Sequence, residues 1–101
     1  MLLIYVPTKN KNEAKEIGKK LVEERMVACA NIIPNITSYF IYEGKVTETD
    51  EALLLLKTNR KYEDIKRRIE ELHSYEIPLI SALELDELNE KYAAWANEVQ
   101  A

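Results

Sequence analysis

The longest extended segment of this chain is too long for the single domain that the chain can form. Residues Val27–Tyr42 follow a strand pattern in which only Pro34-Asn35 is an interruption. Sixteen extended residues reach about 53 Å at a rise of roughly 3.3 Å per residue. A domain of 101 residues has a radius of gyration near 13 Å, and hence a diameter of only about 33 Å. We therefore expect the segment either to bend sharply at Pro34-Asn35 or to project beyond its own domain.

A second strand segment, Ala52–Leu56, is apolar on both of its faces. Helices can cover only one face of a sheet that they pack against, so another layer has to cover the second face. The aromatic run Tyr39–Tyr42 near the hairpin end poses the same problem. We expect a closed homo-oligomer whose sheets pack together through projecting hairpins. The alternative is that the sheet curls and the terminal helix wraps across its open face.

The spacing of apolar residues predicts the order β-α-β-β-α-β, followed by a terminal helix. Strands are predicted at Leu2–Val6, Val27–Tyr42, Val46–Leu56 and Ile77–Leu85. Helices are predicted from a cap at Asn10 or Asn12 to about Arg25, from a cap at Thr58 or Asn59 to Leu72, and over Leu88–Val99. This order is the split βαβ, or ferredoxin-like, plan. The sequence therefore predicts an α+β fold in one domain, residues 1–101, with an antiparallel sheet and a long projecting hairpin.

Charge and composition exclude several classes of partner. The chain has 14 Lys and Arg against 18 Asp and Glu, a net charge of −4, so we expect no nucleic-acid groove. It also has no apolar run of the ~18 residues that a membrane helix needs. The first residues, Met1–Thr8, carry no basic leader, and the single cysteine cannot form an internal disulfide. We expect a cytoplasmic protein that spans no membrane.

His73 and Cys29 are the residues whose side chains most often carry chemistry. His73 is the only histidine, and it is a candidate metal ligand or general base. Its place at a helix end also fits a capping role. Cys29 lies between alanines in a strand, where it is either a small buried hydrophobe or a soft copper ligand that needs partners from elsewhere. A Cys–His nucleophile pair has no further support, because no cofactor loop or catalytic motif accompanies it.

Acidic and aromatic residues offer weaker signals. Most carboxylates fit a solvated surface, although Glu48–Glu51 and Glu84–Glu87 could hold a hard cation weakly through oxygen. Tyr92 and Trp95 share one face of the terminal helix, so we expect them in the core, with base or ligand stacking as the alternative.

An ordered set of short strings runs along almost the whole chain. The set comprises Ala28–Pro34, Thr37-Ser38, Glu43–Lys45, Glu51, Leu56–Thr58, His73–Pro78, Tyr92 and Trp95. Together these strings resemble the CutA family of divalent-cation tolerance proteins. The resemblance implies a ferredoxin-like subunit in a homotrimer, a non-enzymatic role in tolerance to copper and other divalent metal ions, and weak metal binding. It also implies a likeness to PII regulatory proteins, so the alternative is a module that binds a small metabolite or a partner protein in clefts between subunits.

The resemblance also assigns roles to single residues. Cys29, Lys57, His73, Tyr75, Glu76 and Trp95 match family positions at the cleft between subunits. Lys57 would meet an anionic group, Glu76 a cation and Tyr75 a planar ligand, whereas Cys29 and His73 are the metal candidates. Family members with a copper site use a cysteine late in the first strand and a His-His pair. Val6, Leu72 and His73 occupy those positions here, so only His73 is retained.

Overall fold

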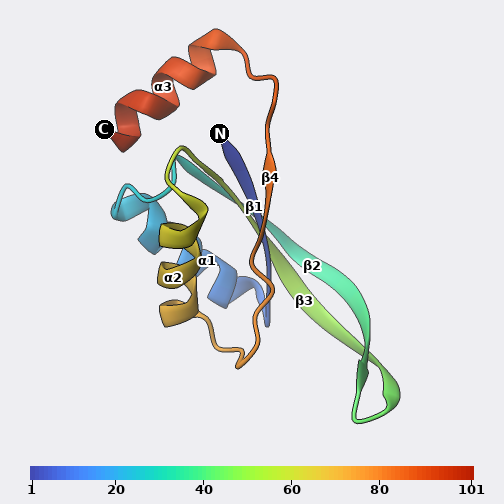
Figure 1. The fold of residues 1–101 in the computed structure, drawn as a ribbon. Helices are drawn as coiled ribbons and strands as arrows, with labels where there is room; N and C mark the ends of the chain where they lie inside the picture. Colours follow the sequence, from blue (N-terminus) through green and yellow to red (C-terminus); the bar gives the residue numbers. More distant parts are fainter.

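The computed structural model describes all 101 residues. Its elements are β1 (Leu2–Thr8), α1 (Lys11–Glu23), β2 (Cys29–Tyr42), β3 (Lys45–Thr58), α2 (Tyr62–Leu72), β4 (Ser81–Glu84) and α3 (Glu90–Gln100). The strands form one antiparallel sheet in the order β2-β3-β1-β4. Helices α1 and α2 lie together on one side of this sheet, and α3 lies beyond the end that carries the N-terminus (Figure 1). The predicted α+β, ferredoxin-like order is confirmed. None of the helices is both long and apolar enough to cross a membrane.

The two faces of β3 are both apolar, as predicted, and they have different surroundings. Ala52, Leu54 and Leu56 are fully buried beneath the helices. There they join a core cluster with Ile4, Val6, Ala14, Ile17, Leu21, Val27, Ile65, Ile69 and Ile80. Leu53 and Leu55 alternate with them and point to the opposite side, which we call the open face. No helix of this chain lies over the middle of that face (Figure 1).

The hairpin of β2 and β3 both bends and projects. The pairing of β2 with β3 shifts between Ile33 and Ile36, so Pro34 and Asn35 form a bulge within a continuous strand. The pairing of β3 with β1 ends at Ala52 and Thr8. Beyond that point β2 and β3 pair only with each other, and residues 36–51 form a two-stranded ribbon. The ribbon points away from both helices (Figure 1), and the molecule measures 47 × 26 × 23 Å. Because the long axis exceeds the diameter of a compact domain of this size, the predicted projection is confirmed.

Helix α1 begins at the predicted cap. The Asn10 side chain accepts a hydrogen bond from the backbone N–H of Glu13 at 2.9 Å, which satisfies one free donor of the first turn. On the buried face, a Cβ added at Gly18 would lie 3.0 Å from the Cβ of Ala30 and 3.1 Å from a methyl group of Leu54. The absence of a side chain at Gly18 therefore lets α1 approach the sheet closely. The helix ends at Glu23, two residues before the predicted end, and Arg25 follows with a positive φ of 62°.

The start of α2 and the extent of β4 also differ from the prediction. Helix α2 has Lys61 as its N-cap without a side-chain hydrogen bond, because Thr58 and Asn59 are engaged elsewhere. The Thr58 hydroxyl donates to the carbonyl of Met26, and the Asn59 amide donates to Asn97. Strand β4 covers Ser81–Glu84 rather than residues 77–85, since it pairs only with Leu2–Tyr5 of β1.

Helix α3 is fixed at its C-terminal end by Gln100. The Gln100 side chain is buried, at 6% exposure. Its Oε1 accepts from the backbone N–H of Asn59 at 2.9 Å. Its Nε2 donates to the Met26 carbonyl at 3.0 Å, to the Thr58 hydroxyl at 3.1 Å and to the Arg25 carbonyl at 3.4 Å. These bonds join α3 to the loop after α1 and to the end of β3, which places the aromatic residues of α3 beside the sheet.

Candidate functional site

The loop between α2 and β4 is tied to the end of β1 through the His73 ring. His73 ends α2, where its backbone N–H bonds to the Ile69 carbonyl. Its ring Nδ1 accepts a hydrogen bond from the backbone N–H of Tyr75 at 3.1 Å. Because Nδ1 acts as an acceptor, Nε2 carries a proton, which it donates to the Pro7 carbonyl at 2.9 Å. His73 therefore holds the loop in place with both nitrogens and is itself buried.

Glu13 supports the same loop from α1. Its carboxylate accepts hydrogen bonds from the backbone N–H groups of Lys9 at 3.0 Å and Ser74 at 2.9 Å. Burial raises the pKa of Glu13, but the hydrogen bonds to Ser74 and Lys9 and the nearby His73 ring have the larger effect. The pKa of Glu13 therefore lies below its ordinary value. Glu13 is a charged anchor at neutral pH.

The loop presents Tyr75 to a carboxylate on the open face of the sheet. The Tyr75 hydroxyl donates to Oε2 of Glu51 at 2.7 Å, and the Tyr75 ring lies 4.8 Å from the His73 ring between centroids. Burial, the bond to Glu51 and the charges of Glu51 and Glu13 raise the pKa of Tyr75 well above its ordinary value. Tyr75 is therefore a neutral phenol that donates to a charged acceptor.

A groove of about 420 Å³ opens beside this pair; we call it the Tyr75 groove. It is lined by Pro7, Phe40, Thr49, Glu51, Tyr75, Ile77 and Leu79. The volume is within the range of roughly 300–1,000 Å³ that is typical of small-molecule sites. The walls are mostly apolar, and Glu51 is the only charged residue among them. The arrangement can hold an apolar body with a polar or cationic group against the carboxylate.

A second cluster lies at the other end of the open face. Lys57 and Cys29 are cross-strand partners there. The Lys57 ammonium group is 5.5 Å from the centre of the Tyr92 ring, which contacts the Trp95 ring at 5.3 Å between centroids. Lys57 lies six positions after Glu51 on β3, which corresponds to about 20 Å along the strand. Within one chain the predicted cleft residues therefore form two groups, with Lys57, Trp95 and Cys29 at one end and Tyr75 at the other.

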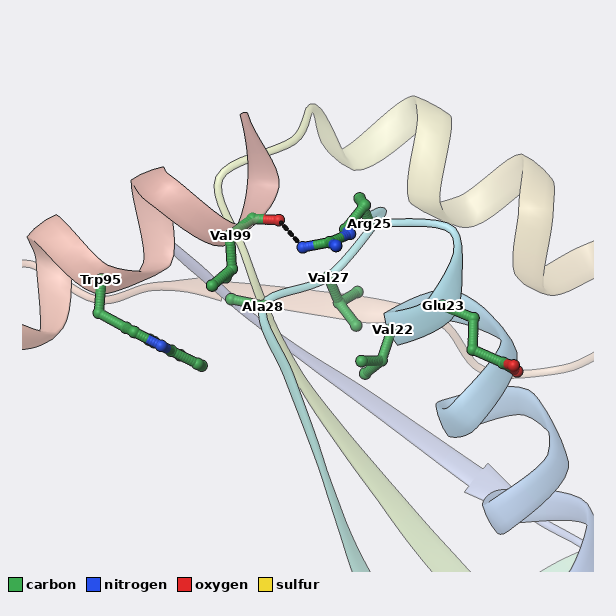
Figure 2. Close-up of a pocket in the computed structure, with 7 residues that line it drawn as sticks. All are labelled: Val22, Glu23, Arg25, Val27, Ala28, Trp95 and Val99. Atoms are coloured by element: carbon green, nitrogen blue, oxygen red, sulfur yellow. Dashed lines mark hydrogen bonds between the residues drawn. The ribbon is translucent and has the colours of Figure 1, made fainter.

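Trp95 also borders a groove of about 370 Å³ between α3, the end of α1 and the start of β2. Figure 2 shows Trp95 and Val99 on α3 across from Val22, Val27 and Ala28. The Arg25 side chain spans the groove and donates to the Val99 carbonyl at 2.9 Å. Trp95 is 44% exposed, so the expectation that it belongs to the core is wrong. It presents an apolar ring at the surface, where it is free to contact a ligand or a second chain.

The residues of a single chain do not fit a metal centre. No three His, Cys, Asp or Glu side chains lie close enough together to hold an ion. Both ring nitrogens of His73 have backbone partners, and the Cys29 thiol makes one hydrogen bond, to the Asn31 amide oxygen at 3.9 Å. Cys29 pairs with Lys57 of β3, which pairs on its other side with Leu3 of β1. His73 lies against Pro7, which is about 13 Å farther along β1 than Leu3. The structure does not bring the two predicted metal residues together.

Three acidic residues remain to be placed: the predicted Glu76, and Glu51 and Glu13, to which the sequence assigned no site role. Glu76 is exposed, and its side chain has no hydrogen-bond partner in the chain. From the sequence, Glu51 was named as part of an acidic run and among the strings shared with the family, without a role at the site, and Glu13 was not named. The capping spacing from Asn10 to Glu13 was a usable signal for Glu13. Nothing local pairs Glu51 with Tyr75, because 24 positions separate them.

Comparison with known proteins places the chain in a family. A profile described as "CutA1 divalent ion tolerance protein" matches residues 2–99. The divalent-cation tolerance protein CutA of Thermus thermophilus is 42% identical over 99 residues, which are 97% of this chain and 94% of that protein. The CutA of Pyrococcus horikoshii is 36% identical over 97% of this chain and 96% of its own.

Solved structures agree with this comparison. The crystal structure of the divalent ion tolerance protein CutA1 from Ehrlichia chaffeensis superposes with a TM-score of 0.94 at 31% identity, covering 99% of this chain and 94% of that one. The CutA1 structure of Pyrococcus horikoshii gives a TM-score of 0.92 at 37% identity, covering 98% of this chain and 97% of its own. Sequence, element order and three-dimensional fold agree, and the chain belongs to the CutA1 family of divalent ion tolerance proteins.

Proposed function

We propose that this chain is a homotrimer that acts in tolerance to divalent metal ions and catalyses no reaction. The observation that carries the proposal is the full-length match to relatives that are named divalent-cation tolerance proteins in Thermus and Pyrococcus. The one nucleophile–base pair that the sequence offers, Cys29 with His73, is separated in the chain, which supports a role other than catalysis. The resemblance to the CutA family implies three copies. The exposed apolar surface of one chain gives a physical reason for the copies to associate.

Apolar surface on the projecting ribbon and on the open face supports assembly. Tyr39, Phe40, Ile41 and Tyr42 on β2 and Val46 on β3 are all exposed. Burial of apolar surface is worth about 25 cal/mol per Å², so a second copy over these residues would be strongly stabilised. In addition, β2 is an edge strand of 14 residues whose outer backbone groups have no partner strand. Copies that pack through the ribbon would cover both features.

Metal binding, in this proposal, is weak and draws its ligands from more than one copy. High-affinity sites use three or four side chains, and a single chain gathers no such group. Cys29 is half-buried on the open face, so a second copy packed there could add donors beside its sulfur. His73 would have to release a backbone partner in order to bind an ion. We retain copper as the test metal because Cys29 is a soft ligand.

The trimer is tested by light scattering coupled to size-exclusion chromatography. The expected mass is about three times the 11.7 kDa of the chain. Phe40→Asp places a charge on the ribbon and should lower this mass, whereas Glu43→Gln at the exposed turn should leave it unchanged. A soluble, folded wild-type chain of 11.7 kDa would refute the assembly.

Metal binding is tested by calorimetric titration with Cu²⁺. Wild type should show weak binding that Cys29→Ser and His73→Gln each reduce, whereas Asn12→Ala on the exposed side of α1 should have no effect. If copper does not bind to the wild type, or both variants bind it as well as the wild type does, the assigned ligands are wrong. Growth of a copper-sensitive bacterial strain that lacks its own CutA then tests tolerance directly, with the empty vector as control.

A second candidate function is a regulatory module that binds a small metabolite or a partner protein at clefts between subunits. The two grooves beside Tyr75 and Trp95 favour it, because each joins apolar walls to a few polar groups. Lys57, Tyr75, Glu76 and Trp95 are its proposed contact residues. Thermal-shift screening of nucleotides and organic anions should find a compound whose stabilising effect Lys57→Ala removes and Lys45→Ala retains. A uniformly flat screen would count against this function.

We propose the cytoplasm as the compartment, since Cys29 is a free thiol and reducing conditions preserve it. A related structure from Archaeoglobus fulgidus, 29% identical, is described as a periplasmic divalent cation tolerance protein. Fractionation of cells that express the native chain tests the assignment. Recovery in the periplasmic fraction would overturn it.

A further inference from the structure

The open face of the sheet carries two charged side chains whose charges are not balanced within the chain. The strand register places every second residue of each strand on this face, and the charged ones among them are Lys45, Glu51 and Lys57. Lys45 lies beside the hairpin turn and is exposed. Glu51 and Lys57 are half-buried, and neither takes part in an ion pair. Away from the turn, the strands of this face therefore carry one anion and one cation, both unpaired.

Both side chains are held in place by aromatic residues that leave the charge free to bind. The Tyr75 hydroxyl donates to Oε2 of Glu51 at 2.7 Å, and Oε1 accepts no hydrogen bond in the chain. The Lys57 ammonium group lies 5.5 Å from the centre of the Tyr92 ring, a contact that attracts a cation without neutralising it. Each group can therefore form an ion pair with a second chain at a small further cost in ordering.

The proposed assembly would remove water from both groups. When a second copy covers the open face, a carboxylate or an ammonium group that is left there without a partner is strongly destabilising. Glu51 and Lys57 cannot pair within one chain, because they lie about 20 Å apart along β3. The cations of α1 and α2 lie on the opposite side of the sheet, away from this contact (Figure 1). The open face of an identical copy, in contrast, offers each group a partner of opposite charge.

From this complementarity we infer that Lys57 of one copy forms an ion pair with Glu51 of the next copy. In a ring of three, each copy would present Lys57 to one neighbour and Glu51 to the other, so three equivalent pairs would close the ring. The pair would also fix the direction in which two open faces meet, because a copy turned end for end would bring like charges together. The inference deepens the proposed assembly and rests on it, but it is independent of metal binding.

Charge reversal in the full chain tests the pair. Light scattering over a dilution series gives the protein concentration at which half of the copies are assembled. Lys57→Glu and Glu51→Lys should each raise this concentration at least about tenfold, because each variant places two like charges at the contact. The double variant restores opposite charges in exchanged positions, so it should return to within about threefold of wild type. Single variants that assemble like wild type, or a double variant that is not rescued, would overturn the inference.

Matched variants identify the charges that matter. Lys61→Glu and Glu16→Lys make the same changes in net charge at exposed positions outside the open face, so both should assemble like wild type. Lys45→Glu reverses the other cation of the open face and should have a smaller effect than Lys57→Glu, because water already surrounds Lys45. An effect of Lys45→Glu that equals or exceeds that of Lys57→Glu would assign the contact to the hairpin turn and overturn the pair.

A covalent link gives a second measurement that does not depend on unbalanced charges. In a Cys29→Ser background, Lys57→Cys and Glu51→Cys together remove both charges, so no unpaired charge is left at the contact. Two cysteines about 20 Å apart in one chain cannot form a disulfide, so oxidation should link three copies into a covalent trimer. Only unlinked chains on a non-reducing gel would overturn the inference. A monomeric wild type would refute the assembly itself, whereas a trimeric wild type whose variants are neither rescued nor linked would refute only the ion pair.

Discussion

Removal of the Gln100 side chain should detach α3 from the sheet before the rest of the chain unfolds. In Gln100→Ala, three well-formed hydrogen bonds are lost, to the Asn59 N–H, the Met26 carbonyl and the Thr58 hydroxyl. Each is worth about 1 kcal/mol net, so docking of α3 should weaken by about 3 kcal/mol. The contact at 3.4 Å to the Arg25 carbonyl is too long to add much. A change of this size corresponds to roughly a 150-fold shift in the local equilibrium.

The only tryptophan of the chain provides the assay. Trp95 lies on α3 beside Tyr92, so its fluorescence reports the docking of this helix. In wild type, the urea transitions followed by Trp95 fluorescence and by far-UV circular dichroism should coincide. In Gln100→Ala, the fluorescence transition should move to lower urea and precede the circular dichroism transition. Protein concentration must be held constant, because association of copies adds to apparent stability.

A neighbouring side chain on the same helix serves as the control. Asn97 makes one exposed hydrogen bond with Asn59, so Asn97→Ala should cost at most about 1 kcal/mol and keep the two transitions together. If Gln100→Ala and Asn97→Ala have equal effects, or if the loss in Gln100→Ala is below about 1 kcal/mol, buried hydrogen bonding does not fix α3.

Three further outcomes are expected. Gly18→Ala should lower the free energy of unfolding by about 1–3 kcal/mol, because the added Cβ meets Ala30 at 3.0 Å; urea unfolding that finds equal or greater stability would contradict the close packing. Because folding lowers the pKa of Glu13, the ionised carboxylate stabilises the folded chain at any pH above the ordinary carboxyl pKa. This stabilisation is lost as the pH falls through the lower pKa that Glu13 has in the folded chain. Glu13→Gln should therefore show a smaller loss of stability between pH 6 and pH 3 than wild type, and an identical pH profile would refute this role. His73→Ala should increase amide exchange at Tyr75, whose N–H loses its acceptor, while exchange in α1 stays unchanged; equal protection at Tyr75 in both proteins would contradict the positioning role of the ring.

The fold could be predicted from the sequence because its strongest signals are local or periodic. The apolar spacing of α1, the alternation along β3 and the cap at Asn10 are properties of neighbouring residues. Strand β4 was predicted too long, since its extent depends on the stretch of β1 that is available to pair with it. The N-cap of α2 was misplaced for a similar reason, because Thr58 is used by Met26, which lies 32 positions away.

The site was less accessible to sequence reasoning than the fold. Tyr75 was singled out, but its acceptor Glu51 was given no role at the site, and only the folded chain brings the two together. Lys57 and Trp95 were grouped with Tyr75 at a cleft between subunits, and within one chain they lie at the far end of the open face from Tyr75. Gln100 carries no sequence signal at all, since its four partners come from segments that are distant in the chain.

The distance between the two clusters on the open face sets a minimum length for any ligand that contacts both of them. Strand β3 holds Lys57 and Glu51 about 20 Å apart, so a compound that contacts both residues of one subunit has to be at least that long. Nucleotides and amino acids are too short to span that distance, so each molecule would contact only one of the two clusters. A stretched peptide of about six residues would fit this span, whereas a compact molecule would not.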